Sequence, residues 1–173
     1  MKYISVPEDR IAVLIGKKGK AKAEIERKGK CELEIDSKTG DIWIHENLAD
    51  PLLTFKTEEV IKAIGQGFSP KHALDLFKED FYLATIDIRD YTKKKLSHLK
   101  RIKGRIIGTR GKAKHMIEEK CSASLSIFGD TISIIADQEH LEIAKRATDM
   151  LLSGCEHTTV YAFLEKKSRE LKY

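Results

Sequence analysis

Aromatic residues and long apolar runs are both scarce in this sequence. Aromatics make up 7% of the 173 residues, and no apolar run approaches the length of a membrane-spanning helix. The first residues are too few and too polar for a signal peptide, so none is expected. Three cysteines form no Cys-x-x-Cys pair. Reduced thiols in a cytoplasmic protein are the simplest interpretation.

A large excess of one charge is also missing. The chain has 32 Lys and Arg against 27 Asp and Glu, a net charge of +5. Because this excess is small, any attraction to a polyanion depends on where the cations lie. Hydrophobic residues account for 41% of the chain and charged residues for 34%, a balance typical of a globular protein.

The chain contains an internal repeat. Residues 14–26 align with residues 106–118, and the offset of 92 also superimposes residues 33 and 35 on residues 125 and 127. A gap of three residues then pairs Gly40-Asp41 with Gly129-Asp130. The sequence therefore indicates duplication of one fold unit. The positions identical in both copies are Gly16/Gly108, Gly19/Gly111, Lys20/Lys112, Ala21/Ala113, Lys22/Lys114, Ile25/Ile117 and Glu26/Glu118.

Each copy has the same predicted order of strand, helix, helix, strand, strand and helix. Periodicity predicts these elements over residues 3–6, 8–15, 20–28, 31–35, 42–44 and 55–64 in the first copy. In the second copy it predicts them over residues 82–88, 96–107, 112–120, 124–128, 131–135 and 138–152. A further helix is expected at 160–171. The predicted fold is α+β, with a first domain at 1–68, a connector containing a short helix at 69–79, and a second domain at 80–173.

Each pair of leading helices is separated by a Gly-x-x-Gly turn. Such a turn carries little side chain and opens the next helix, whose N-terminal N–H groups and dipole favour a phosphate. Cations surround both turns and can neutralise successive phosphates of a strand. The residues concerned are Lys17, Lys18, Lys20 and Lys22 in the first copy, and Arg105, Arg110, Lys112 and Lys114 in the second.

Ile-Gly-x-x-Gly between two helices, followed by a hairpin and a helix, resembles the KH domain. The resemblance implies two tandem eukaryotic-type KH domains, each a three-stranded antiparallel sheet with helices on one face, plus a C-terminal helix. In that family the loop holds the backbone of about four nucleotides beside an aliphatic groove. The resemblance places Gly16–Gly19 and Gly108–Gly111, including Thr109, on RNA. It places Ile15 and Ile107 in the groove, with Ile25, Ile35, Ile117 and Ile127 as further candidates.

Both copies depart from the usual KH pattern in one respect. Lysine, Lys22 or Lys114, stands three places after the second glycine, where KH domains normally carry an aliphatic residue. With the helix that follows Thr159, the shared Gly-Lys-x-Lys-x-x-Ile-Glu pattern is similar to the archaeal form of the Dim-two family, also called partner of Nob-one. The related Krr-one type, another two-KH ribosome-assembly family, is the alternative. The Dim-two resemblance implies a non-enzymatic protein that assists small-subunit maturation and binds near the 3′ end of its rRNA.

Other functional classes fit the residues less well. A P-loop needs four residues between its glycines and then Ser or Thr, whereas both turns here have two residues and end in Lys-Ala. Cys155 and His157 lack a second ligand pair, so packing is favoured over a metal site. No catalytic arrangement can be assembled from spacing. We therefore expect no enzymatic activity, no cofactor and no metal.

The expected function is binding of single-stranded small-subunit rRNA during ribosome assembly and pre-rRNA processing. Residues 93–114 hold ten basic residues and no acid, so the second loop is expected to be the more positive. Expected partners are this rRNA, an rRNA-processing endonuclease, and assembly or translation initiation factors, with no membrane. The alternative is a non-catalytic accessory subunit of a nuclease or helicase that acts mainly through protein–protein contacts.

Overall fold

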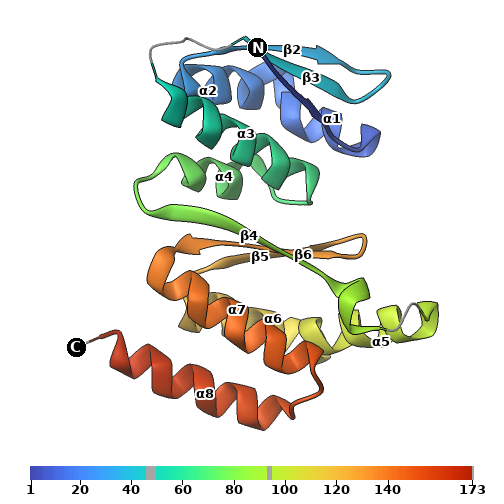
Figure 1. Cartoon of the computed structure of the whole chain (residues 1–173), viewed down its shortest axis with the longest axis vertical. Coiled ribbons are helices and arrows are strands. Elements are labelled where there is room, and N and C mark those ends of the chain that lie inside the picture. Colours follow the sequence, from blue (N-terminus) through green and yellow to red (C-terminus); the bar gives the residue numbers. More distant parts are fainter. Residues whose placement is uncertain (46–49, 93–94, 173) are drawn as a thin grey trace. The chain divides into compact units, whose positions relative to one another are not determined.

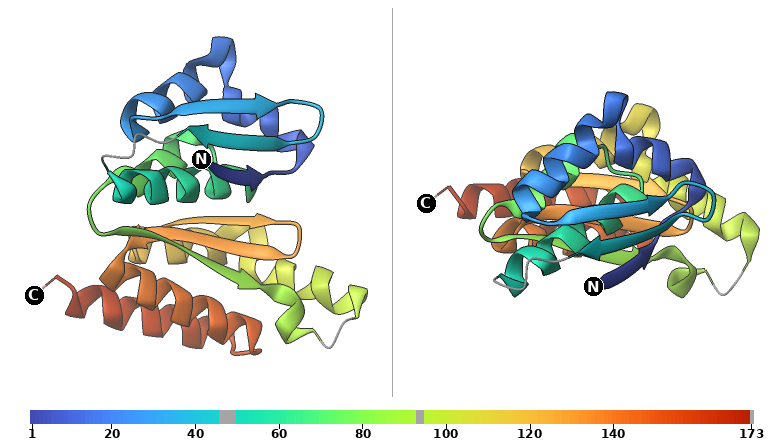
Figure 2. Two further views of the ribbon diagram at one scale, coloured as in Figure 1. Left: turned by 45° about the horizontal axis from the view of Figure 1, so that its top comes forward. Right: turned by 90° about the horizontal axis from the view of Figure 1, so that it is seen from above.

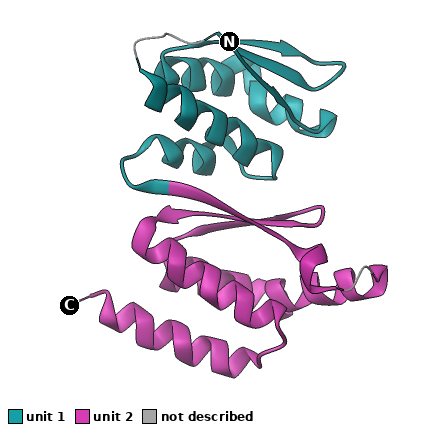
Figure 3. Cartoon of the chain, in the orientation of Figure 1, with its two compact units in different colours: residues 1–81 teal, residues 82–173 magenta. Residues whose placement is uncertain are grey.

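A computed structural model describes residues 1–45, 50–92 and 95–172. The chain forms two compact units, residues 1–81 and residues 82–173 (Figure 3). The segment predicted as a connector forms a short helix, α4 (Pro70–Ala73), and a 3-10 turn, η2 (Leu74–Phe77). Both pack against the third helix of the first unit. The structure therefore assigns this segment to the first unit.

The first unit follows the predicted order of elements. Helix α1 has the predicted bounds, and the short strands differ from the prediction by about one residue at their ends. The elements are β1 (Lys2–Ser5), α1 (Glu8–Ile15), the 3-10 turn η1 (Lys17–Gly19), α2 (Lys20–Gly29), β2 (Glu32–Asp36), β3 (Asp41–His45) and α3 (Pro51–Gly65).

The second unit repeats this order and adds a final helix. Its elements are β4 (Phe81–Asp87), the 3-10 turn η3 (Ile88–Tyr91), α5 (Leu96–Ile107), the 3-10 turn η4 (Thr109–Gly111), α6 (Lys112–Lys120), β5 (Ser124–Phe128), β6 (Thr131–Asp137), α7 (Gln138–Leu152) and α8 (His157–Glu170). Helix α8 packs against α6 and α7. It begins three residues earlier than predicted.

Each unit has a three-stranded antiparallel sheet, with strand order β1-β3-β2 or β4-β6-β5. The helices of each unit cover one face of its own sheet (Figures 1 and 2). The α+β fold class predicted from the sequence is therefore confirmed. No helix within the described residues is long and apolar enough to cross a membrane.

The two hairpins differ in length by two residues, not by the three expected from the sequence alignment. Asp36 pairs with Asp41 across the first turn, and Phe128 pairs with Thr131 across the second. Structurally, Asp41 therefore corresponds to Thr131, and the predicted match of Gly40-Asp41 with Gly129-Asp130 is wrong by one residue. The Gly-Asp letters coincide by chance, because strand register is set by the buried side chains on the sheet and by the length of the turn.

Helix α3 begins four residues before the predicted start. The Asp50 side chain accepts a hydrogen bond from the Leu53 N–H at 3.2 Å, and Pro51 occupies the first turn. Both features favour a helix start at this point. The apolar face of α3 then packs against the sheet, and Val60, Ile61 and Ile64 are fully buried. The earlier start of α3 therefore results from helix capping, which cannot be predicted from apolar periodicity.

Candidate nucleic-acid interface

The two Gly-x-x-Gly loops have nearly the same backbone conformation. Gly16 and Gly108 have φ values of 73° and 74°, and Gly19 and Gly111 have φ values of 72° and 74°. The residue before each second glycine, Lys18 or Arg110, is also left-handed, with φ of 53° or 55°. Left-handed conformations are uncommon for residues with a side chain. The repeat in the sequence is therefore a repeat of one strained turn.

The first glycine of each loop lies against the start of the next helix. A Cβ atom on Gly16 would lie 2.6 Å from the Ala21 Cβ, and one on Gly108 would lie 2.7 Å from the Ala113 backbone nitrogen. Cβ atoms essentially never approach another heavy atom that closely. By contrast, a Cβ on Gly19 or Gly111 would point into open space. The first glycine therefore allows the loop to pack closely against the next helix, whereas the second glycine is needed for its left-handed backbone conformation.

Each loop presents cations next to a helix N-terminus that no side chain caps. Gly19 and Gly111 are the N-cap residues of α2 and α6, and neither helix receives a side-chain capping bond. The positive end of each helix dipole is thus open to an anion. The exposed residues around it are Lys17, Lys18 and Lys20 in the first unit, and Thr109, Arg110 and Lys112 in the second.

Fewer isoleucines are accessible to line the predicted aliphatic groove than the sequence suggested. Ile107 is 39% exposed at the end of α5, and Ile15 is half-buried at the end of α1, so both border a loop. Ile25 and Ile117 are completely buried, so their predicted place in an open groove is wrong. Each faces the core because the apolar side of its helix is turned toward the sheet. The remaining candidates, Ile35 and Ile127, are half-buried on strands β2 and β5.

The unusual lysine after each loop belongs to a network that occurs in both units. In the first unit, the Lys22 Nζ lies 3.6 Å from a carboxylate oxygen of Glu26. The same oxygen accepts a hydrogen bond from the Leu33 N–H at 2.8 Å. The second unit has the equivalent arrangement, with the corresponding distances 3.3 and 2.9 Å, in Lys114, Glu118 and Leu125.

This network explains the departure from the KH pattern. The glutamate satisfies a backbone N–H at the beginning of an edge strand, and the lysine compensates the half-buried carboxylate. The role of Glu26 and Glu118 was missed at the sequence level. The available indication was their identity in the two copies together with the lysine four residues earlier.

Arg105 has a different environment from the other predicted RNA-binding cations. Its guanidinium donates hydrogen bonds to the carbonyl oxygens of Leu151, at 3.2 Å, and Cys155. It therefore joins α5 to the C-terminal end of α7, where cations are favoured by the helix dipole. His157 also bonds the Arg105 carbonyl oxygen through Nε2, at 2.9 Å. These contacts give Arg105 and His157 a role in packing, so Arg105 is not among the cations that remain available to RNA.

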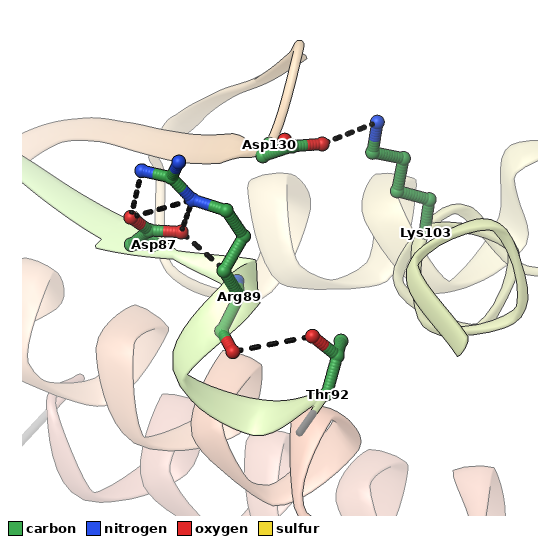
Figure 4. Close-up of polar contacts among 5 residues, drawn as sticks. All are labelled: Asp87, Arg89, Thr92, Lys103 and Asp130. Carbon is green, nitrogen blue, oxygen red and sulfur yellow. Dashed lines mark hydrogen bonds and ion pairs between the residues drawn. The ribbon is translucent and has the colours of Figure 1, made fainter. Parts of the chain in front are cut away.

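The folded structure brings acidic residues close to the basic stretch at residues 93–114, so its local excess of positive charge is smaller than the sequence alone suggests. Lys93 and Lys94 lie outside the described residues. Lys103 pairs with Asp130 in the β5–β6 turn at 3.2 Å, while the nearby Arg89 folds back onto Asp87 (Figure 4). Acidic residues from other parts of the fold thus neutralise some of the predicted positive field. The exposed cations of this stretch that form no ion pair with another described residue are Lys95, Lys100, Arg101, Arg110 and Lys112.

Comparison with known protein families supports the KH assignment. Residues 82–169 match the family described as eukaryotic-type KH domain (KH-domain type I). A KH domain-containing protein from Methanocaldococcus jannaschii is 40% identical over 173 residues, with 99% of this chain and 76% of that protein covered. The pre-rRNA-processing protein PNO1 of Coccidioides immitis is 30% identical over 141 residues. That match covers 81% of this chain, which spans only 55% of the PNO1 length.

Two solved structures from Pyrococcus horikoshii have the same architecture. Dim2p is 44% identical, with a TM-score of 0.88 and coverage of 95% of this chain and 98% of Dim2p. A complex of a/eIF2alpha, aDim2p and rRNA contains a chain that is 43% identical, with a TM-score of 0.90 and coverage of 98% and 94%. With its type I KH domain and these relatives, the chain belongs to the PNO1/Dim2 family of KH-domain proteins.

Proposed function

We propose that this chain is a non-catalytic protein that binds single-stranded small-subunit rRNA, near its 3′ end, during ribosome assembly and pre-rRNA processing. The main supporting observation is the pair of nearly identical loops, each placed at an uncapped helix N-terminus among exposed cations. The names of the relatives support the choice of RNA, because they include pre-rRNA-processing proteins and an aDim2p solved with rRNA.

In this proposal both units act as KH domains. The family match covers residues 82–169 only. The first unit has the same element order, strand order and loop conformation, which supports the same assignment. Each loop would hold the sugar–phosphate backbone of about four nucleotides. The neighbouring Ile15 or Ile107 would contact the unstacked bases.

The mechanism we infer is occupancy of a single strand. A strand held along the loops cannot pair with another RNA segment, and its access to processing factors is delayed until release. We propose a cytoplasmic location, with an rRNA-processing endonuclease and assembly or initiation factors as partners. A solved complex of the relative aDim2p with a/eIF2alpha supports the initiation-factor proposal.

The first test compares single-stranded and double-stranded RNA of one sequence. The single strand should bind more tightly, because KH recognition needs unstacked bases. Its log K should fall against log salt with a slope of roughly −3 to −4 if four to six phosphates are neutralised. Equal affinity for both forms, or a slope near zero in a filter-binding titration, would contradict the proposal. If the chain alone has no RNA affinity, an accessory subunit acting through protein contacts becomes the better explanation.

The second test compares the two loops by charge reversal. Replacing Thr109 and Arg110 with Asp should weaken binding of a ten-nucleotide RNA by at least tenfold, about 1.4 kcal/mol. The corresponding change at Lys17 and Lys18 should cost less, because the unpaired cations on α5 make the surroundings of the second loop more positive, so more of the affinity is expected to come from that loop. That order opposes simple charge counting, since the first-loop variant loses more positive charge. A larger loss in the first-loop variant would refute the ranking.

A matched control carries the same change of charge outside the loops. Thr158→Asp with Arg169→Asp alters two exposed residues of α8, and the net charge changes by the same three units as in the second-loop variant. Circular dichroism should show that all three variants are folded. If the control loses as much affinity as the second-loop variant, net charge rather than the loop is responsible.

A further inference from the structure

A groove in the first unit lies beside the loop, and lysine is the most frequent residue in its lining. It runs between α2 and the segment formed by α4 and η2, with a volume of about 470 Å³. Gly16 and Lys17 of the loop are part of its lining. The groove is therefore continuous with the surface that we propose binds RNA.

This groove lies on a different side of α2 from Lys22 and Glu26. The α2 residues that line it include Lys20, Glu24 and Lys28, which are spaced four apart and so share one side of the helix. At 100° per residue, Lys22 and Glu26 lie about half a turn away, toward strand β2. The loop thus stands where two separate surfaces meet.

The groove has an excess of positive charge after its ion pairs are counted. Five lysines and two acids line it. Asp75 pairs with Lys78 at 2.7 Å, and Glu24 lies 3.8 Å from the Lys28 Nζ. The three lysines that remain without an ion pair to any described residue are Lys17, Lys20 and Lys71.

The equivalent side of α6 in the second unit is covered. Lys112 corresponds to Lys20 in the repeat, and its Nζ lies 5.4 Å from the ring centre of Tyr161 on α8. Lys120 corresponds to Lys28 and pairs with Glu165 of α8 at 2.9 Å. In the second unit both lysines therefore contact α8, whereas in the first unit Lys20 and Lys28 line an open groove, in which Lys28 pairs with Glu24 of its own helix.

We propose that this groove binds backbone phosphates of the RNA beyond the nucleotides held by the first loop. The inference rests on the proposed RNA-binding function and extends it. From Lys20 to Lys28 the helix rises by about 12 Å, so the lysines form a row that leads away from the loop. Several separated lysines along a continuous surface can each meet one phosphate of an RNA strand. An open groove is sufficient for such contacts, because backbone phosphates do not need to enter a deep pocket. The first unit would therefore hold a longer segment of RNA than its loop alone.

The test removes two groove cations that lie outside the loop. Lys28→Gln and Lys71→Gln together remove the charge but keep part of each aliphatic stem, and they should leave binding of a four-nucleotide RNA unchanged. Binding of a twelve-nucleotide RNA should weaken. Lys71 has no ion pair with a described residue, and Lys28 has a long one, at 3.8 Å to Glu24, so one to two phosphate contacts are lost. Each lost contact lowers the salt slope by about 0.7, so the affinity at 0.1 M salt should fall by roughly 5- to 25-fold.

A control variant has the same loss of charge on the third helices. Lys62 is exposed and Lys145 is partly exposed, and each pairs with a glutamate three residues earlier, at 3.2 and 3.3 Å. Changing both to Gln should leave the affinity for the twelve-nucleotide RNA nearly unchanged. If the wild-type chain binds neither RNA, the proposed function itself fails. If it binds and the groove variant matches the control on the long RNA, the groove inference is overturned and an acidic protein becomes the better candidate for these lysines.

Discussion

The two glycines of one loop should differ in their contribution to stability. At Gly108 the backbone has φ 74° and ψ 174°, a region that is almost restricted to glycine and costs about 1–3 kcal/mol for other residues. The added Cβ of Gly108→Ala would also lie 2.7 Å from the backbone nitrogen of Ala113, which cannot rotate away. Overpacking of this kind costs about 1–3 kcal/mol. The expected loss is therefore about 2–6 kcal/mol.

The second glycine allows the same substitution at lower cost. Gly111 has φ 74° and ψ 13°, and a Cβ there would meet open space. Gly111→Ala should cost only the left-handed backbone penalty, about 1–2 kcal/mol. A third substitution, Gly104→Ala inside α5, also points into open space and should stabilise the chain by about 0.5–1 kcal/mol.

Urea unfolding of the full chain, followed by circular dichroism, measures all three free energies. The expected order of stability is Gly104→Ala, wild type, Gly111→Ala and Gly108→Ala. Gly16→Ala and Gly19→Ala should repeat the difference in the first unit. If the first and second glycines cost the same, the close approach to the next helix does not constrain the loop, and our account of the Gly-x-x-Gly pattern is wrong.

Three other predictions concern the second unit. Glu118→Ala should destabilise it by about 1–3 kcal/mol in urea unfolding, because a backbone N–H of β5 loses its hydrogen-bond acceptor. The control, Glu119→Ala on the surface, should change stability by less than about 0.5 kcal/mol. Equal effects of the two substitutions would show that the Glu118 hydrogen bond does not stabilise the unit. The hydrogen bond to a carboxylate on α7 raises the pKa of Tyr91 to about 12. The stabilisation that this bond gives the folded chain is therefore complete below pH 10 and is lost as the pH rises from 10 through 12. Tyr91→Phe should remove this pH dependence of stability from the unfolding curves. Burial raises the pKa of the Cys121 thiol to about 12. A thiol reagent at pH 8 should therefore modify half-buried Cys155 well before Cys121, which peptide mass spectrometry can determine. Faster reaction of Cys121 would show that the structure around it opens readily.

Local sequence features predicted most of the secondary structure. The bounds of α1, α5, α6, β5 and α7 are those predicted, because apolar periodicity and glycine breaks act over a few residues. The start of α3 was missed because the prediction used apolar periodicity alone and did not consider Asp50 and Pro51 as helix-starting residues. Their capping role could have been recognised from the sequence.

The sequence by itself determined the duplication, the element order of each unit, and the two loops among cations. These properties depend on residue type and short-range spacing. The tertiary structure decided which of the predicted residues can meet a ligand. It buried Ile25 and Ile117 in the cores and directed Arg105 to the end of α7.

Tertiary packing also made the two similar helices different on one side. Lys28 and Lys120 occupy equivalent positions in the repeat, yet Lys120 pairs with a residue of α8 whereas Lys28 lines an open groove. Their environments depend on segments about 45 residues distant in the chain, such as η2 and α8, which pack against the helix only after folding. Short-range spacing carries no information about such contacts, and for that reason the groove became visible only in the folded chain.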